Sequence, residues 1–252
     1  MILATENLAK SFGGVAALEP FSFTLAGGIT AIIGPNGAGK TTLFNLLSGL
    51  YAPSGGRIRY RGEDITDLPV AERARRGMQR TFQNLQIFFG MSAIENVMVG
   101  ASRHLRLGLL PALLDWPTIR RDTRHAREAA EHLMRRVGLD AYLNARADAM
   151  PYGALKRLEI ARALAAEPDL LLLDEPAAGL NPSETQEIDR LIRAIAEGGT
   201  AVLLVEHDMR LVMAISERII VLDQGRPIAD GPPASIRAHS EVIRAYLGEA
   251  AP

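Results

Sequence analysis

The sequence predicts an α/β fold in which a helical lobe is inserted into a core of alternating strands and helices. Three observations lead to this prediction. A short apolar strand, a glycine-rich loop and a helix follow one another between residues 30 and 50, and residues 86–165 are rich in helical patterns. From residue 170 onward, strand-length apolar runs alternate again with helical spacing.

The N-terminal part is expected to contain short strands joined by turns. The predicted strands are residues 2–5, 21–25 and 30–33. Ala26-Gly27-Gly28 is the predicted turn between the last two. A helix from about Lys40 to Leu50 follows, and Pro53-Ser54-Gly55-Gly56 is expected to end it.

The last third of the chain reads as buried strands with an amphipathic helix between them. Residues 170–173 and 201–205 are fully apolar, as buried parallel strands are. Residues 184–197 place apolar side chains at helical spacing. Residues 219–222 and 226–229 are predicted to form a hairpin around Asp223-Gln224-Gly225.

Composition excludes several classes of protein. The chain has 252 residues, 48% hydrophobic and 23% charged, which is typical of a globular protein. The net charge of −1 gives no long-range field that would attract nucleic acid or an anionic membrane. There is no cysteine, so disulfides and thiolate chemistry are excluded.

We expect neither a signal peptide nor a membrane-spanning helix. The N-terminus lacks a basic stretch followed by an apolar segment. The longest apolar candidate, residues 107–116, is interrupted by Pro111 and Asp115 and is too short to span a bilayer. Any contact with a membrane is therefore expected to go through another protein or through the surface of the chain.

Gly34-Pro35-Asn36-Gly37-Ala38-Gly39-Lys40-Thr41 fits the P-loop pattern GxxxxGK[ST], between an apolar strand and a helix. Glycines let backbone N–H groups approach phosphate oxygens closely, and the helix N-terminus adds a favourable dipole. We expect Lys40 to reach the β- and γ-phosphates and the Thr41 hydroxyl to bind Mg²⁺. The alternative is a glycine-rich turn that binds no ligand.

Two acids follow the apolar run 170–173, in the segment Asp174-Glu175-Pro176. An apolar strand that ends in an acid is the Walker B arrangement, which delivers Asp174 to the metal from a rigid, dry base. Glu175 comes next, so it is expected to point to the other side and to act as a general base on a water facing the γ-phosphate. The alternative is a strand end capped by surface acids.

With both motifs in place, the sequence resembles the ATP-binding-cassette (ABC) ATPases over essentially its whole length. The resemblance implies a P-loop NTPase (RecA-like) core with an N-terminal antiparallel β subdomain, residues 1–85 and 166–252, and an inserted helical signature subdomain, residues 86–165. Gln83 matches the Q-loop glutamine, which touches Mg²⁺ and the attacking water and links to the membrane subunit. Ala178-Gly179-Leu180-Asn181 matches the D-loop of the dimer interface, and His207 matches the switch histidine on the γ-phosphate.

The resemblance also implies which residues bind ATP and Mg²⁺. The expected ATP-binding residues are Gly34, Pro35, Asn36, Gly37, Ala38, Gly39, Lys40, Thr41, Thr42, Phe12 and Gly153. The expected metal ligands are Thr41, Gln83 and Asp174, and the expected catalytic residues are Glu175, His207, Gln83 and Lys40. Phe12 lies where the family places an aromatic ring under the adenine; the alternative is an ordinary core aromatic.

The signature motif departs from the family pattern. The usual Leu-Ser-Gly-Gly-Gln aligns with Met150-Pro151-Tyr152-Gly153-Ala154. Pro151 thus replaces the serine whose hydroxyl meets the partner's γ-phosphate, a contact worth about 1 kcal/mol or somewhat more. Gly153 remains, and the helix after it offers N-terminal amides to an anion. This signature therefore lacks one hydroxyl contact that the family pattern supplies.

Several segments resemble the ATPases of branched-chain (hydrophobic) amino acid importers. They include Thr81-Phe82-Gln83-Asn84, Pro151-Tyr152-Gly153 and Glu206-His207-Asp208-Met209. The Tyr-Gly signature and the arginine-rich insert near 101–127 resemble the first of the two ATPase subunits of such importers. The implied partners are a second ABC ATPase subunit, in a homo- or heterodimer, the transmembrane permease subunits and, indirectly, a periplasmic solute-binding protein. The implied location is the cytoplasmic face of the inner membrane, without nucleic acid and without a direct membrane span.

Two further features have competing interpretations. Phe88-Phe89-Gly90-Met91 follows Gln83 and either lines a groove for a cytoplasmic helix of the membrane subunit or packs in the ordinary way. The arginines at 73, 75, 76, 120, 121, 124 and 127 are predicted to cover solvated helix faces rather than a lipid-binding surface, because neighbouring acids balance them.

Two rival functions remain. A non-transport ABC ATPase acting on nucleic acid or ribosomes would carry coiled-coil arms or two cassettes, whereas this chain has one P-loop, no heptad array and no basic excess. A regulatory ATP-binding subunit is supported only by the altered signature. The ATP turnover of the assembled complex separates these rivals from an ATPase that drives transport.

Overall fold

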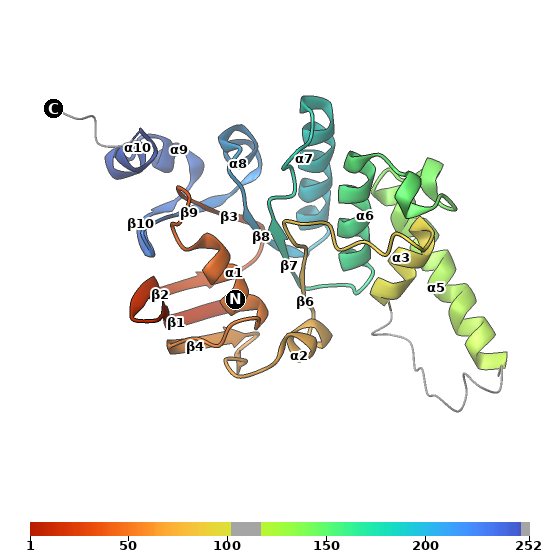
Figure 1. The fold of residues 1–252 in the computed structure, drawn as a ribbon, viewed down its shortest axis with the longest axis horizontal. Coiled ribbons are helices and arrows are strands. Elements are labelled where there is room, and N and C mark those ends of the chain that lie inside the picture. Colours follow the sequence, from red (N-terminus) through yellow and green to blue (C-terminus); the bar gives the residue numbers. More distant parts are fainter. Residues whose placement is uncertain (102–116, 248–252) are drawn as a thin grey trace.

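The computed structural model describes residues 1–101 and 117–247, which form two β-sheets and the helices beside them (Figure 1). The strands of the larger sheet are β3 (Ile29–Ile33), β6 (Met78–Arg80), β7 (Leu170–Asp174), β8 (Ala201–Val205), β9 (Arg218–Asp223) and β10 (Arg226–Gly231). The strands of the smaller sheet are β1 (Leu3–Phe12), β2 (Val15–Leu25), β4 (Gly55–Tyr60) and β5 (Glu63–Asp64). The helices near the larger sheet are α1 (Lys40–Ser48), α2 (Val70–Arg75), α7 (Pro182–Glu197), α8 (Met209–Ile215), α9 (Pro233–Arg237) and α10 (Ser240–Leu247). Between β6 and β7 come α3 (Ala93–Gly100), α5 (Pro117–Arg136), two short 3₁₀ helices (Asp140–Tyr142 and Ala147–Ala149) and α6 (Tyr152–Leu164).

The larger sheet has the order β10-β9-β3-β8-β7-β6 and is parallel except for β10. The smaller sheet has the order β2-β1-β4-β5 and is antiparallel. The predicted α/β fold class is therefore confirmed. β1 and β2 are longer than predicted, because polar residues interrupt their apolar pattern, whereas the two strands stay paired through several shifts of register.

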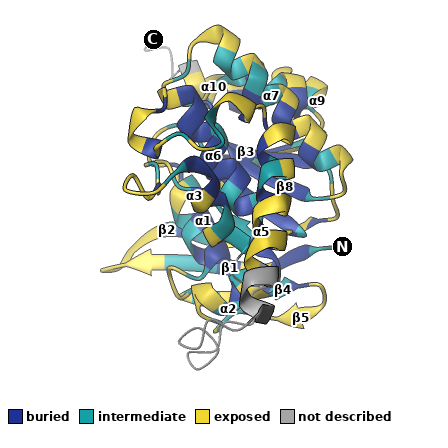
Figure 2. Cartoon of the chain, turned by 90° about the vertical axis from the view of Figure 1, so that its right-hand side faces the viewer, coloured by how far each residue is buried: buried dark blue, intermediate teal, exposed yellow. Residues whose placement is uncertain are grey.

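Apolar side chains pack on both faces of the larger sheet. On β7, Leu170 and Leu172 join the cluster that contains Phe44 of α1, whereas Leu171 and Leu173 join the cluster that contains Ile192 of α7. Every residue of β3, β7 and β8 is buried, as the uninterrupted apolar runs predict. Figure 2 shows this contrast, with buried residues along β3 and β8 and exposed ones along α5.

Helix α1 ends at Ser48, before the predicted Leu50. Gly49 adopts a left-handed conformation, φ 84°, and its N–H donates to the Leu46 carbonyl. This is the usual glycine termination of a helix, and it acts before the Pro53-Ser54-Gly55-Gly56 segment is reached.

The Arg73 side chain completes this helix end from α2. Its guanidinium donates to the carbonyl oxygens of Leu46 at 2.7 Å, Leu47 at 2.8 Å, Thr66 at 2.8 Å and Leu68 at 2.9 Å. Arg73 is 2% exposed, so its prediction as part of a solvated helix face is wrong. It is buried because it satisfies carbonyl groups that the end of α1 and the following loop leave without partners.

The other arginines of that group differ from Arg73 where the structure describes them. The Arg75 side chain is exposed and pairs with Glu72. Arg124 and Arg127 are exposed on α5. The side chains of Arg120 and Arg121 and the apolar run 107–116 lie outside what the structure describes. None of the described helices has both the length and the apolar character needed to cross a membrane.

The predicted hairpin near the C-terminus is confirmed. Asp223 pairs with Arg226, and the two residues between them, Gln224 and Gly225, have φ of 46° and 81°. Two positive φ values in a two-residue loop define the turn that suits the twist of a hairpin. At its tip the Gly225 N–H donates to Ala38 O at 3.1 Å, and Gly225 O accepts from the Glu19 N–H at 2.9 Å.

We predict that Arg73→Met lowers the free energy of unfolding by about 3 kcal/mol, because several buried carbonyl groups lose their donor. Arg75→Met, at an exposed position of the same helix, should change it by no more than about 0.5 kcal/mol. Urea unfolding of the two variants measures the difference. Equal effects would show that the Arg73 hydrogen bonds do not stabilise the end of α1.

Candidate functional site

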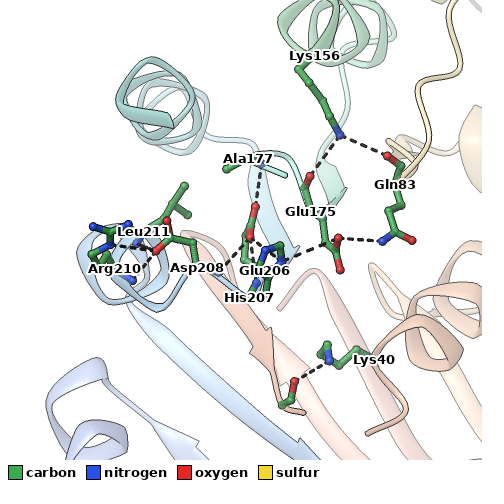
Figure 3. A network of polar contacts seen from close by, with 11 residues as sticks. Lys40, Gln83, Lys156, Glu175, Ala177, Glu206, His207, Asp208, Arg210 and Leu211 are labelled. Carbon is green, nitrogen blue, oxygen red and sulfur yellow. Dashed lines mark hydrogen bonds and ion pairs between the residues drawn. The ribbon is translucent and has the colours of Figure 1, made fainter. Parts of the chain in front are cut away.

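The predicted functional residues gather at the carboxyl ends of four neighbouring strands (Figure 3). The glycine-rich loop follows β3, Glu206 and His207 follow β8, Asp174 and Glu175 close β7, and Thr81-Phe82-Gln83 follows β6. The carboxyl edge of a parallel sheet is where α/β proteins bind ligands. The sheet order thus joins motifs that lie far apart in the sequence.

Glycines shape the loop after β3 because two of them have no room for a side chain. A Cβ on Gly34, whose φ is 151°, would lie 2.0 Å from Leu222 O. A Cβ on Gly39, whose φ is 96°, would lie 2.7 Å from Ala17 O. Both positions require a positive φ and a close approach of backbone to backbone. Gly37 also has a positive φ, 81°, and faces open space.

Lys40, the first residue of α1, turns back over its own loop. Its Nζ donates to Gly34 O at 2.7 Å and to Pro35 O at 2.9 Å. Burial lowers the pKa of Lys40, and the negative charges of Glu175 and Asp174 partly oppose that change. The ammonium group thus lies in the middle of the loop and within the field of both acids.

The other residues of the loop leave donors and hydroxyls available. Asn36, Gly37 and Thr41 are exposed, and Pro35 and Thr42 are half-buried. Ala38 is buried and donates its N–H to Pro35 O at 3.2 Å. A glycine-rich loop that leads into the start of a helix is the kind of backbone arrangement that binds anions.

Asp174 is almost completely buried at the end of β7. Its Oδ2 accepts a hydrogen bond from Arg80 Nη2 at 2.8 Å, and each of the two side chains is 7% exposed. Arg80 was not among the predicted site residues. A charged residue at the end of the three-residue strand β6 was the available signal, but only the fold shows its partner.

Glu175 lies between Gln83 and His207 (Figure 3). Its Oε2 accepts from Gln83 Nε2 at 2.9 Å and lies 3.9 Å from His207 Nδ1. Its backbone N–H donates to Val205 O at 2.9 Å, and its φ of 48° is left-handed. A non-glycine residue in this region carries strain, which is commonly found at functional positions. The geometry brings Glu175, Gln83 and His207 together, as the motifs predicted.

Glu206 supports this group from within the core. It is 1% exposed, and its carboxylate accepts backbone N–H groups from Ala177 at 2.8 Å, His207 at 3.0 Å and Asp208 at 3.4 Å. It therefore connects the segment after Glu175 to the segment that carries His207. Glu206 was not among the predicted site residues; an acid directly after a buried apolar strand was the available signal.

Buried charged side chains of helix α6 form hydrogen bonds to the segment after β6. Lys156 Nζ donates to Gln83 O at 3.4 Å and to Glu175 O at 3.3 Å. Glu159 Oε1 accepts the N–H groups of Phe82 and Gln86, both at 3.4 Å. Lys156 and Glu159 are each 2% exposed and lie three residues apart, on one face of the helix. Both were missed, because in sequence they look like ordinary polar positions of an amphipathic helix.

Phe12 and Gly153 have surroundings of their own. Phe12 is 45% exposed, so it is not a core aromatic; its ring contacts Tyr51, and Lys10 lies over it. Pro151 precedes the first residue of α6, and Gly153 is buried in the first turn. A Cβ on Gly153 would lie 2.5 Å from Glu184 Oε1. Gly153 thus packs against the start of α7, and the structure places neither residue among the groups at the strand ends.

The arrangement defines the class of this protein. A glycine-rich loop, a lysine, two carboxylates, a glutamine and a histidine meet at one sheet edge, as the binding and hydrolysis of a nucleoside triphosphate require. A family model described as "ABC transporter" matches residues 18–178, and one described as "Branched-chain amino acid ATP-binding cassette transporter" matches residues 226–252. The chain belongs to the ABC transporter family of ATP-binding cassettes.

Curated relatives match nearly the whole chain. The high-affinity branched-chain amino acid transport ATP-binding protein BraF of Pseudomonas aeruginosa is 47% identical over 99% of this chain and 98% of its own length. The protein LivG of Escherichia coli, with the same description, is 46% identical over the same shares. The lipopolysaccharide export system ATP-binding protein LptB of Escherichia coli is 36% identical over 98% of this chain and 97% of its own length.

Solved structures of ATP-binding cassettes have the same fold. A nucleotide-free cassette from an ABC transporter superposes with a TM-score of 0.85 at 30% identity, covering 98% of this chain and 99% of that one. The ADP conformation of a cassette gives the same TM-score, identity and coverage. These structures confirm the ABC ATPase fold that the sequence predicted.

We predict that the contribution of Glu206 to stability depends on pH. Burial raises the pKa of Glu206 above its ordinary value of 4.5. The folded protein therefore keeps this proton at pH values where the unfolded chain has lost it. The contribution of Glu206 to the free energy of unfolding is complete at pH values below its ordinary pKa. It is lost as the pH rises through the raised pKa that Glu206 has in the folded protein.

Urea unfolding of the unmutated protein and of Glu206→Gln, from pH 4.5 upward, measures this effect. Relative to the glutamine variant, which does not titrate there, the unmutated protein should lose stability as the pH rises. A difference that stays constant over the range, or grows with pH, contradicts the prediction.

Proposed function

We propose that this chain is the ATP-hydrolysing subunit of an ABC importer for branched-chain or other hydrophobic amino acids. One observation supports the ATPase activity above all: Lys40, Glu175, Gln83 and His207 converge at the carboxyl ends of adjacent strands (Figure 3), and Asp174 is the last residue of β7 at the same edge. Amino acids as cargo are supported by the full-length similarity to BraF and LivG and by the match of residues 226–252. The second candidate, a regulatory ATP-binding subunit, is favoured only by Pro151 and Ala154 in the signature segment.

The loop at 34–41 binds the triphosphate in this proposal. Backbone N–H groups and the start of α1 face the phosphate oxygens, and Lys40 exchanges the carbonyls of Gly34 and Pro35 for the β- and γ-phosphates. Thr42 and the exposed ring of Phe12 contribute contacts at the sides of the nucleotide, with Phe12 under the adenine.

The residues present fit Mg²⁺ as well. Mg²⁺ prefers oxygen ligands, and the exposed Thr41 hydroxyl, the Asp174 carboxylate and the side-chain oxygen of Gln83 supply them. The Gln83 amide nitrogen donates to Glu175, which leaves the Gln83 oxygen free to face a cation. When bound, the cation neutralises charge on the β- and γ-phosphates.

Glu175 is the proposed general base. Water attacks the γ-phosphorus, the bond from that phosphorus to the β–γ bridging oxygen breaks, and Glu175 takes the proton of the water. Gln83 and His207 flank its carboxylate, so they orient the water and steady the γ-phosphate. Chemistry of this kind depends mainly on positioning and electrostatics, which a rigid strand end provides.

The proposed partners are a second ABC ATPase subunit and the transmembrane permease subunits, with a periplasmic solute-binding protein acting indirectly. The nucleotide would lie between the loop of one ATPase subunit and the signature helix of the other, where Gly153 and the first turn of α6 supply amides. Work at the cytoplasmic face of the inner membrane follows from the permease contact.

A groove beside the Gln83 segment suits the permease contact. It has a volume of about 510 Å³ and is lined by Phe82, Leu85, Ile87, Phe88 and Val99, among others. Phe88 in this lining is 47% exposed, and the neighbouring residues Phe89 and Met91, which do not line the groove, are 46% and 40% exposed. This exposure favours a docking surface over ordinary packing. Since α6 binds the same segment through Lys156 and Glu159, movement at the groove would reach Gln83 and Glu175 directly.

We predict that Glu175→Gln reduces ATP turnover of the assembled transporter by at least about 10²-fold and leaves ATP binding intact, because only the base is lost. Lys40→Ala should abolish ATP binding itself. Glu197→Gln, at the exposed end of α7, serves as the control for removing a carboxylate. Turnover is followed by phosphate release and binding by equilibrium dialysis.

Undiminished turnover in Glu175→Gln would show that Glu175 is not the base. An unmutated complex that binds ATP without turning it over supports the regulatory candidate instead.

We also predict that Phe88→Ser, at an exposed residue that lines the groove, reduces co-purification of the chain with co-expressed permease subunits by at least about fivefold, since an exposed apolar contact at an interface is worth about 1 kcal/mol or more. Val15→Ser changes an exposed apolar residue of β2 and should have no effect. ATP affinity of both isolated variants should match that of the unmutated chain. Equal co-purification of the two variants would exclude the groove as the contact.

A further inference from the structure

Arg80 is a buried charge that connects three parts of the site. It is the last residue of β6, three residues before Gln83, and its side chain is 7% exposed. Nη2 donates to Asp174 Oδ2 at 2.8 Å. Nη1 donates to Asn45 Oδ1 at 2.7 Å and to Ser48 Oγ at 2.9 Å, both on α1.

Two aromatic rings fix the guanidinium in place. Its central carbon lies 5.0 Å from the ring centroid of Phe82 and 5.6 Å from that of Phe44. Such cation–π contacts favour a cation that has been removed from water. Arg80 therefore cannot leave Asp174 without also losing Asn45, Ser48 and both rings.

We propose that Arg80 is the positioning residue of the metal-binding carboxylate. It holds one oxygen of Asp174 and leaves the other to the divalent cation that accompanies the nucleotide; this inference rests on the proposed function. None of the described residues donates a hydrogen bond to Asp174 Oδ1. Groups that hold a metal ligand from behind in this way fix its orientation.

The contacts with α1 add a second constraint. Thr41, Asn45 and Ser48 lie four and seven residues apart on α1, so they share one face of the helix. By holding Asn45 and Ser48, Arg80 fixes the helix that carries the Thr41 hydroxyl relative to the strand that carries Asp174. One guanidinium thereby sets the spacing between two oxygen ligands that come from residues 133 positions apart.

In the alternative arrangement, Arg80 would compete with the cation: its guanidinium would occupy the cation's place beside Asp174 and would have to move away before the cation binds. The geometry favours positioning, because Arg80 uses a single oxygen and is held on its other side by four groups of the protein. The two arrangements make opposite predictions for the strength of cation binding once Arg80 is removed.

The test measures ATP affinity of the purified full chain by equilibrium dialysis, first in EDTA and then over a range of Mg²⁺ concentrations. Mg²⁺ is expected to increase ATP affinity. For Arg80→Met, the Mg²⁺ concentration that gives half of this increase should rise by about 10–100-fold, the usual cost of losing a group behind a metal ligand. ATP affinity in EDTA should stay within about threefold of the unmutated value.

Arg73→Met is the matched control. Arg73 is also a buried arginine bonded to α1, through Leu46 and Leu47, but it does not contact Asp174. It should lower stability and leave the Mg²⁺ dependence unchanged. An equal shift in both variants would overturn the proposal, because it would reflect a loosened helix rather than the carboxylate.

Should Arg80→Met fail to fold by circular dichroism, Asn45→Leu replaces it. That variant keeps the Arg80–Asp174 pair and removes one of the two hydrogen bonds that hold Arg80 to α1, so it should raise the Mg²⁺ requirement by at least about threefold. An unchanged or lower Mg²⁺ requirement, in whichever variant folds, overturns the role of Arg80. Absence of ATP binding in the unmutated chain overturns the proposed function, and the Arg80 inference with it.

Discussion

The pairing of β7 with β8 is the constraint on which the geometry of the site depends. Asp174 lies opposite Val205 in this ladder, and the next residue, Glu175, still donates its N–H to Val205 O at 2.9 Å. The two chain segments therefore leave the sheet side by side, which is why Glu175 meets His207. Both strands are apolar on both faces, so hydrophobic pattern alone specifies their register weakly. The hydrogen bond from Ala177 to the Glu206 carboxylate, just beyond the strands, adds a polar constraint on that register.

Motifs in the sequence sufficed for the fold class and for the groups that converge at the strand ends. Strand–loop–helix order identified the loop at 34–41, and apolar runs located β7 and β8. Residues whose environment depends on distant contacts could not be predicted in this way. Arg80 meets Asp174 from 94 positions away, and Lys156 meets Gln83 from 73. Arg73 was assigned to solvent because nearby acids suggested a charged surface, whereas the end of α1 buries it.

Helix α6 links the inserted helices to the chemistry at the sheet edge. Lys156, Glu159 and Arg162 follow one another at three-residue spacing; the first two bind the backbone around Gln83, and Arg162 lies over the Phe88 ring. At its N-terminus, the Tyr152 ring lies close to Gly179, where a Cβ would come within 3.2 Å of it. Buried charges of this kind keep their geometry only while every partner stays in place. A rigid shift of α6 therefore acts on the Gln83 segment, on the Glu175 carbonyl and on the segment after Glu175 together.

The tip of the β9–β10 hairpin gives a last consequence. Gly225 donates to Ala38 inside the glycine-rich loop and accepts from Glu19 of β2, so this short turn links the loop at 34–41 to the smaller sheet. Surface turns are ordinarily the places where a chain accepts insertions, fused tags and circular permutation. Residues 224 and 225 of this protein should not tolerate such insertions. An epitope or reporter placed there would break the hydrogen bond to Ala38 and so disturb the glycine-rich loop.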